Sequence, residues 1–195
     1  MALVYPPYPA PLLPRPNVDR PSPGNLSRVE MFPVVTELGV VVGQVTRTDA
    51  HGGTGLLHPV VHLHILDREG RLYLQRRSFE KDLLPGYWDT AVGGHVIYGE
   101  TITEALYREA EEELHFHDFN PVSVDTYVFE GIREKELVHV FACVGDFHPR
   151  PDGDEVIDGR FWSFTEIEDN LGKSHLTPNF EQEFVRIRGT LASLL

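Results

Sequence analysis

The sequence predicts a mixed α/β sandwich, and three observations support this fold class. Several short stretches rich in Val, Ile and Leu have the length and alternation of strands, whereas helical periodicity appears in only three segments. A glycine-rich loop precedes the first of these helical segments. With 195 residues, 41% of them hydrophobic, the chain can bury a sizeable core without covalent cross-links.

The N-terminal segment differs in texture from the rest of the chain. Nine of the fifteen prolines fall within the first 33 residues, where neither helical nor strand periodicity is visible. We expect an extended arm over residues 1–30, either loose or lying across a surface, and one folded domain over residues 31–195. The prolines and the lack of a basic first region argue against a secretory signal.

The strand-like segments follow in order. Residues 33–35 and 40–45 predict two strands joined by a turn at 36–39. Residues 58–66, in which Val61, Leu63 and Ile65 alternate with other residues, predict a longer strand. A turn at 67–70 would lead to a strand at 71–77, and two more strands are expected at 121–130 and 136–145.

The three helical segments carry start signals. Thr101 followed by Glu104 forms a capping box in front of a helix over residues 102–114. Thr165 and Glu168 give the same signal for a short helix over residues 166–171. The last helix opens with Thr177-Pro178, a cap followed by a first-turn proline, and continues through Phe180, Phe184 and Ile187.

Charge and cysteine content exclude several classes of function. Thirty acidic against seventeen basic residues leave a formal charge of −13, which repels nucleic-acid backbones and anionic membranes. We therefore expect no nucleic-acid partner, and an anionic substrate would need metal ions or placed cations. Cys143 is the single cysteine, so no internal disulfide or paired-cysteine site exists, and the cytoplasm is favoured. No run of 18 apolar residues predicts a membrane-spanning helix.

A cluster of carboxylates in the helix 102–114 is the first feature that indicates chemistry. At about 100° per residue, Glu109, Glu112 and Glu113 fall within roughly a 100° arc of one face. Like charges at this spacing repel, which favours a hard cation such as Mg²⁺ or Mn²⁺ between them over an ordinary solvated acidic face. Arg108 could orient one carboxylate, and the Gly93-Gly94 pair lets the backbone approach a ligand closely.

This segment resembles the Nudix box, G-x5-E-x7-R-E-hydrophobic-x-E-E-x-G. The matching residues are Gly94, Glu100, Arg108, Glu109, Glu112 and Glu113. The resemblance implies a Nudix α/β/α sandwich with a mixed central sheet, and a metal-dependent attack of water on a diphosphate bond. It implies Glu109, Glu112, Glu113 and Glu100 as metal ligands, with either Glu109 or Glu112 as the base and Arg108 assisting. His115 stands where the family has a glycine, which affects the helix end.

Further stretches are similar to the isopentenyl diphosphate isomerase branch of this superfamily. They are 51–58, 75–81, 85–88, 94–95 and 134–136. The resemblance implies a second metal, Mn²⁺ or Zn²⁺, held by His51, His58, His95, Glu134 and Glu136, although these histidines could also be ordinary hydrogen-bonded residues. It also implies that Arg77 and Lys81 hold the substrate phosphates.

One departure bears on the reaction. The isomerase has a cysteine immediately before its Gly-His pair, and this chain has Gly93 there; Cys143 lies in a different strand. The expectation is therefore a hydrolase of a small-molecule diphosphate, either a nucleoside diphosphate derivative or an isoprenoid-type diphosphate. The alternatives are an isomerase-like enzyme and a non-catalytic ligand sensor. The proline-rich arm also leaves a homodimer open.

Five further residues have structural interpretations. His62 and His64 are two apart in a predicted strand, so they share a face, and we expect a solvated face or a role behind the metal ligands. Trp88 and Trp162 are expected to be core aromatics, and Cys143 a small buried hydrophobic residue.

Overall fold

The computed structural model describes residues 29–81, 83–131 and 133–195. The proline-rich arm predicted for residues 1–30 therefore lies outside the described residues, apart from Val29 and Glu30. The predicted domain limits, 31–195, stay a prediction.

A seven-stranded mixed sheet forms the centre of the fold. Its main path runs β5-β4-β3-β8-β7, with β6 paired to β3 and β9 paired to β4. The central pair, β3 and β8, is parallel, and the other pairs are antiparallel. The strands are β3 (Leu57–Leu66), β4 (Leu72–Arg77), β5 (Trp88–Thr90), β6 (Val92–His95), β7 (Val122–Glu130), β8 (Lys135–Val144) and β9 (Val156–Trp162).

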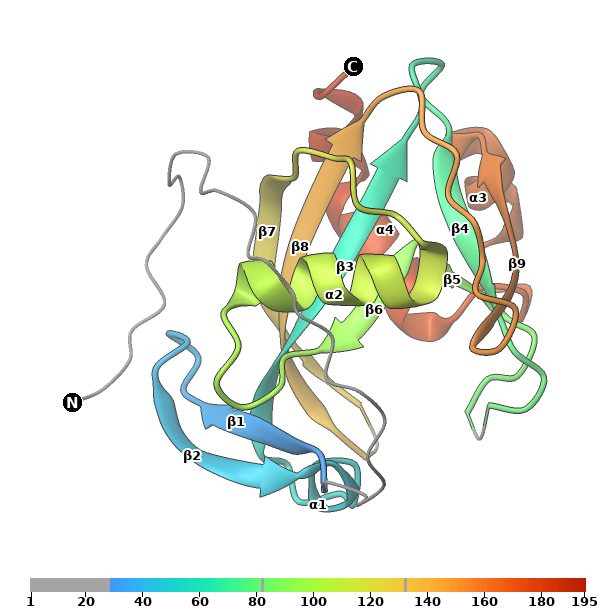
Figure 1. Cartoon of the computed structure of the whole chain (residues 1–195). Coiled ribbons are helices and arrows are strands. Elements are labelled where there is room, and N and C mark those ends of the chain that lie inside the picture. Colours follow the sequence, from blue (N-terminus) through green and yellow to red (C-terminus); the bar gives the residue numbers. More distant parts are fainter. Residues whose placement is uncertain (1–28, 82, 132) are drawn as a thin grey trace.

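Helices cover both faces of this sheet, which gives three layers. In Figure 1, α2 (Ile102–Leu114) crosses in front of the sheet, while α3 (Phe164–Asn170) and α4 (Pro178–Ala192) lie behind it. Each interface has its own apolar cluster. One joins Val61, Leu63 and Ile65 to α2, and the other joins Val60 and Leu66 to α3 and α4. The predicted mixed sandwich is confirmed.

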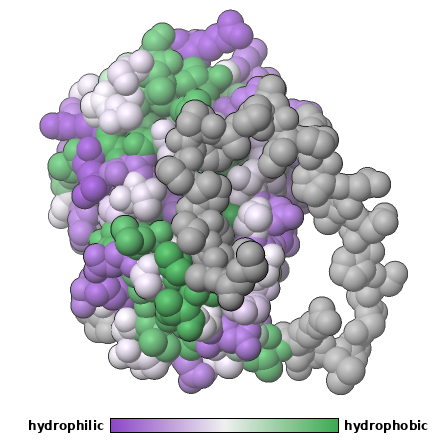
Figure 2. Space-filling view, turned by 90° about the vertical axis from the view of Figure 1, so that its left-hand side faces the viewer, coloured by the Kyte–Doolittle hydropathy of each residue, from purple (hydrophilic) through white to green (hydrophobic). Residues whose placement is uncertain are grey.

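A separate two-stranded sheet lies at the end of β3. Strands β1 (Met31–Val35) and β2 (Val41–Thr46) pair antiparallel, and the short helix α1 (Arg47–Ala50) follows β2. Figure 2 shows hydrophobic residues gathered in the lower part of this side of the molecule, at the height of the β1–β2 hairpin in Figure 1. The exposed hydrophobic residues of the hairpin are Leu38 and Val42.

The predicted elements are found within one or two residues of their expected bounds, and the helix over 102–114 has the expected bounds. Helix α3, predicted over residues 166–171, begins earlier than expected, because Ser163 rather than Thr165 caps it. Strands β5, β6 and β9 and helix α1 were not predicted. They are short or contain glycine, so they carry little periodicity of their own and depend on neighbouring strands. No helix among the described residues is long and apolar enough to cross a membrane.

Candidate functional site

Helix α2 is fixed at both ends in a way that aims its carboxylates at β6. Thr101 accepts from the backbone N–H of Glu104 at 3.2 Å, and the Glu104 carboxylate accepts from the N–H of Thr101 at 2.8 Å, as the capping box predicts. At the other end His115 adopts the left-handed conformation, φ 46°, that the family glycine would adopt. The substitution therefore preserves the helix end at some cost in backbone strain.

Arg108 joins the loop before α2 to the carboxylates on it. Its guanidinium donates to both oxygens of Glu100, at 2.7 and 2.9 Å, and to the backbone carbonyl of His95 at 2.8 Å. It also donates to Glu109 at 2.7 Å and to Glu112 at 3.0 Å. Burial alone would lower the pKa of Arg108, but Glu100 and Glu109 outweigh burial and raise it. Arg108 therefore stays charged and holds these carboxylates in place.

The box carboxylates differ in exposure. The side chain of Glu112 is 60% exposed, whereas Glu109 is largely buried. Glu113 is buried, and one of its oxygens accepts from the backbone N–H of Gly93 at 3.2 Å and from Gln75 at 3.3 Å. Burial, reinforced by the charge of Glu109, raises the pKa of Glu113 to about 8. Burial also raises the pKa of Glu109, in spite of Arg108.

The raised pKa values of Glu109 and Glu113 indicate whether these residues fit a divalent cation. Two carboxyl groups with raised pKa, close enough to repel each other, form a donor set in which a cation would stabilise the ionised form. Gly94 completes the arrangement, because a Cβ at this position would lie 2.0 Å from Cδ of Glu109. The set fits a hard cation. Glu100 is a different case: its oxygens accept from Arg108 and from the N–H of Ile97, so its role as a ligand stays a prediction.

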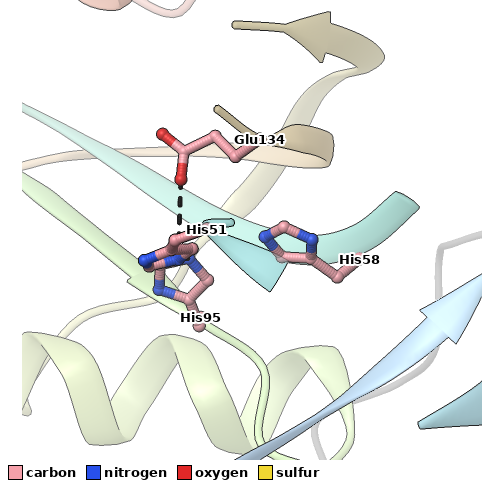
Figure 3. A group of neighbouring side chains, drawn as sticks. All are labelled: His51, His58, His95 and Glu134. Carbon is pink, nitrogen blue, oxygen red and sulfur yellow. Dashed lines mark hydrogen bonds and ion pairs between the residues drawn. The ribbon is translucent and has the colours of Figure 1, made fainter. Parts of the chain in front are cut away.

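A second group of ligand-type side chains lies at the end of the β3–β6 ladder. His51, His58, His95 and Glu134 each offer a ligand atom, and these atoms all lie within 4.8 Å of one another (Figure 3). Nε2 of His51 is 3.0 Å from Nε2 of His95 and 3.5 Å from the Glu134 carboxylate. Glu136, the fifth predicted ligand, has an oxygen 3.9 Å from Nε2 of His95.

The protonation of these histidines suits metal binding. Burial lowers the pKa of all three imidazoles, and at His95 the neighbouring His58 and His51 lower it further. Nδ1 of His58 is 2.9 Å from the carbonyl of Leu56, which leaves its buried Nε2 without a partner. A buried, unpartnered imidazole nitrogen beside two neutral imidazoles and a carboxylate fits a metal such as Mn²⁺ or Zn²⁺. Phe32 stacks on His95, with ring centroids 4.5 Å apart.

The two predicted phosphate-binding cations are already paired. Arg77 donates to Asp89 at 3.3 Å and to the carbonyl of Leu83 at 3.1 Å. Lys81 pairs with Glu155. A substrate would have to share these cations with Asp89 and Glu155, so their role as phosphate contacts stays a prediction.

The expectation of a solvated face for His62 and His64 is wrong. They are 8% and 0% exposed, respectively, and both contact Glu183 of α4. Their ring nitrogens lie 2.8 and 2.7 Å from its two carboxylate oxygens, and the Tyr127 hydroxyl donates to the same carboxylate at 2.7 Å. Glu183 was not among the predicted site residues, although its position, three residues after Phe180 and four before Ile187, puts it on the apolar face of α4.

Trp162 and Cys143 are buried, as expected. Trp88 is half-buried, and it packs edge-to-face against Trp162 at the border of the core.

Comparison with known proteins agrees with this geometry. The family model of the NUDIX domain matches residues 56–180. This range includes every strand of the central sheet, helix α2 and all members of the histidine group except His51. The chain belongs to the NUDIX domain family. Within it, the chain is 34% identical over 143 residues to an isopentenyl-diphosphate Delta-isomerase of Serratia proteamaculans, covering 71% of this chain and 78% of that protein.

Two further NUDIX comparisons bear on the branch and the fold. An uncharacterized Nudix hydrolase of Streptomyces coelicolor is 32% identical over 163 residues, covering 82% of this chain and 88% of that protein. A crystal structure of a Deinococcus radiodurans protein aligns with a TM-score of 0.72 and 25% identity, covering 81% of this chain and 99% of that one. The chain thus lies in the isomerase-like branch of the Nudix proteins, and its relatives carry both isomerase and hydrolase names.

Proposed function

We propose that this chain is a metal-dependent hydrolase that cleaves the diphosphate bond of a nucleoside diphosphate derivative or an isoprenoid-type diphosphate. The observation that carries the proposal is the complete carboxylate set of α2. Glu109, Glu112 and Glu113 are all present, Arg108 holds the first two, and Glu113 is buried against Gly93. Loss of such carboxylates would be expected in a protein that only senses its ligand.

The residues of the chain divide the chemistry among themselves. Glu112 and Glu113 would be the main ligands of Mg²⁺ or Mn²⁺, with Glu109 as a further ligand or as the base. A divalent ion in this position supplies charge neutralisation and a lowered pKa for the attacking water. Glu109 or Glu112 takes the proton of that water as its oxygen bonds to phosphorus. The bond from phosphorus to the bridging oxygen breaks, and its electron pair stays with the leaving group. Arg77 and Lys81 orient the substrate.

The histidine group supports a second metal. His51, His58, His95, Glu134 and Glu136 would hold Mn²⁺ or Zn²⁺. This group and the named isomerase relatives favour one alternative, an isopentenyl diphosphate isomerase-like activity. Gly93 argues against it, because glycine offers no side chain to move a proton on carbon.

Phosphate release from a panel of diphosphates, measured with Mg²⁺ and with Mn²⁺, tests the proposal. The panel contains isopentenyl and dimethylallyl diphosphate, nucleoside diphosphate sugars, dinucleoside polyphosphates and nucleoside triphosphates. We expect turnover of at least one member, and a fall of about 100-fold or more for Glu113→Gln. Deuterium entering an allylic product from heavy water, without phosphate release, would instead establish the isomerase. Binding without turnover in either metal would establish the sensor.

A further inference from the structure

Behind the ligand groups lies a buried histidine–carboxylate pair that no step above uses. His62 of β3 and Glu183 of α4 are joined between Nδ1 and a carboxylate oxygen at 2.8 Å, and Glu183 is fully buried. His64 and Tyr127 contact the same carboxylate, each at 2.7 Å. Three groups therefore fix Glu183, and Glu183 in turn fixes the His62 ring.

The orientation of that ring points its other nitrogen at β6. His62 pairs with Gly93 across the β3–β6 ladder, and a Cβ on residue 93 would lie 3.5 Å from Cδ2 and 3.6 Å from Nε2 of His62. Gly93 therefore places no side chain over this edge of the ring. The backbone N–H of the same glycine donates to Glu113 at 3.2 Å. Gly93 therefore contacts both the His62 ring edge and a box carboxylate.

His64 provides a contrast within the same cluster. It contacts the same carboxylate, but it is fully buried, and its Nδ1 is a buried atom without a partner. The side chain of His62 keeps 11% of its surface exposed. Of the two histidines on Glu183, the exposed surface and the glycine neighbour belong to His62.

The surroundings of His62 favour its charged form. Burial lowers the pKa of His62, but Glu183 outweighs burial, with smaller contributions from Glu136 and Asp89, and raises the pKa to about 9. Other titratable groups of the same neighbourhood are Tyr127 on β7, His64 on its own strand and His95 on β6. With Nδ1 committed to Glu183, the second proton of the ring is on Nε2 and points away from the carboxylate.

We propose that the imidazolium of His62, held by Glu183, is a substrate-binding cation whose Nε2–H donates to an anionic oxygen of the diphosphate. This inference deepens the proposed function and rests on it. An acidic protein needs several placed cations for such a substrate. Arg77 and Lys81, which orient the substrate in the proposed function, share their charge with Asp89 and Glu155, and Arg108 is held by three carboxylates. His62 would add a further cation to them. The edge of the His62 ring that carries Nε2 faces Gly93, which places no side chain over it.

Binding of methylenediphosphonate, whose P–C–P bridge resists hydrolysis, tests the inference in the presence of Mg²⁺. Titration calorimetry would compare the wild type with His62→Gln, with the matched control His64→Gln and with Gly93→Ala. We expect Kd to rise about 10- to 100-fold in His62→Gln, as for the loss of a charged hydrogen bond. His64→Gln should stay within about 3-fold of the wild type. The methyl group in Gly93→Ala should cover the ring edge and weaken binding without changing His62.

A measurement on the wild type keeps the inference testable if a variant does not fold. In protein with ¹⁵N-labelled histidine, methylenediphosphonate should shift the Nε2 resonance of His62 and leave those of His64 unchanged. An unshifted Nε2 resonance, or a wild-type Kd in folded His62→Gln, would overturn the inference. If His62→Gln binds normally while the diphosphate panel is turned over, only this inference fails. If binding depends on His62 but nothing is hydrolysed, only the proposed activity fails.

Discussion

Replacing the buried Glu113 by Gln should make the metal-free protein more stable at high pH. The Glu113 carboxyl has its pKa raised from an ordinary value of 4.5 to about 8, chiefly by burial. Between these values the unfolded chain releases the proton and the folded chain retains it, so folding is opposed increasingly as pH rises. At about 1.4 kcal/mol per pKa unit, the opposing free energy is about 1 kcal/mol at pH 5 and about 4 kcal/mol at pH 8.

Glutamine removes this titration and keeps the local contacts. Its carbonyl oxygen can accept from the N–H of Gly93 and from Gln75 as the carboxylate does. In urea unfolding with EDTA, at pH 5 and at pH 8, the free energy of unfolding of Glu113→Gln should therefore exceed that of the wild type, by a margin that grows with pH. Adding Mn²⁺ should narrow or reverse the margin, because the wild type gains binding energy from the ion.

The matched control is Glu112→Gln, on the same helix. Its side chain is 60% exposed and makes one solvent-facing ion pair with Arg108, so the expected change is within about 1 kcal/mol. The reasoning is refuted if Glu113→Gln is no more stable than the wild type at pH 8, or if its advantage is the same at both pH values.

Three further predictions concern single positions. Gly94→Ala should lower turnover at least about 10-fold, because a Cβ would lie 2.0 Å from Cδ of Glu109 and displace it. The control Gly43→Ala, whose nearest contact is 4.0 Å away, should have no effect on turnover, and equal rates for the two variants would contradict the geometry. His58→Ala should reduce bound Mn or Zn in elemental analysis of the purified protein and weaken metal binding about 10- to 100-fold, and an unchanged metal content would remove the second site. His115→Gly should raise the free energy of unfolding, measured in urea, by about 0.5–1 kcal/mol, because glycine removes the strain of a left-handed residue at φ 46° at some entropic cost. A loss of stability would show that the His115 side chain contributes contacts of its own.

Local signals in the sequence were sufficient to predict the helices whose start and shared face depend on residues close together in the chain. The capping box and carboxylate spacing of α2 depend on residues three and four apart, and Thr177-Pro178 likewise marks the start of α4. Strand β6 is different. Its Val-Gly-Gly-His sequence has no strand periodicity, and it is a strand only because β3 pairs with it.

The candidate site divides in the same way. The carboxylates of α2 are close in the sequence, so their shared face could be predicted, whereas the exposure of Glu112 depends on packing. The partner of His62 and His64 could not be assigned, because Glu183 lies about 120 residues further along the chain. A charged residue on the apolar face of α4 indicates that a buried partner exists, but sequence spacing does not identify it.

Strand β3 carries its histidines only at even-numbered positions. The odd-numbered residues Val61, Leu63 and Ile65 pack under α2, whereas the even-numbered ones include the three histidines together with Val60 and Leu66, which pack against α3 and α4. Insertion or deletion of a single residue upstream within the strand would exchange the two sets, placing imidazoles under α2 and aliphatic side chains beside Glu183. Substitutions at even positions, in contrast, can change ligand chemistry and leave the α2 interface intact.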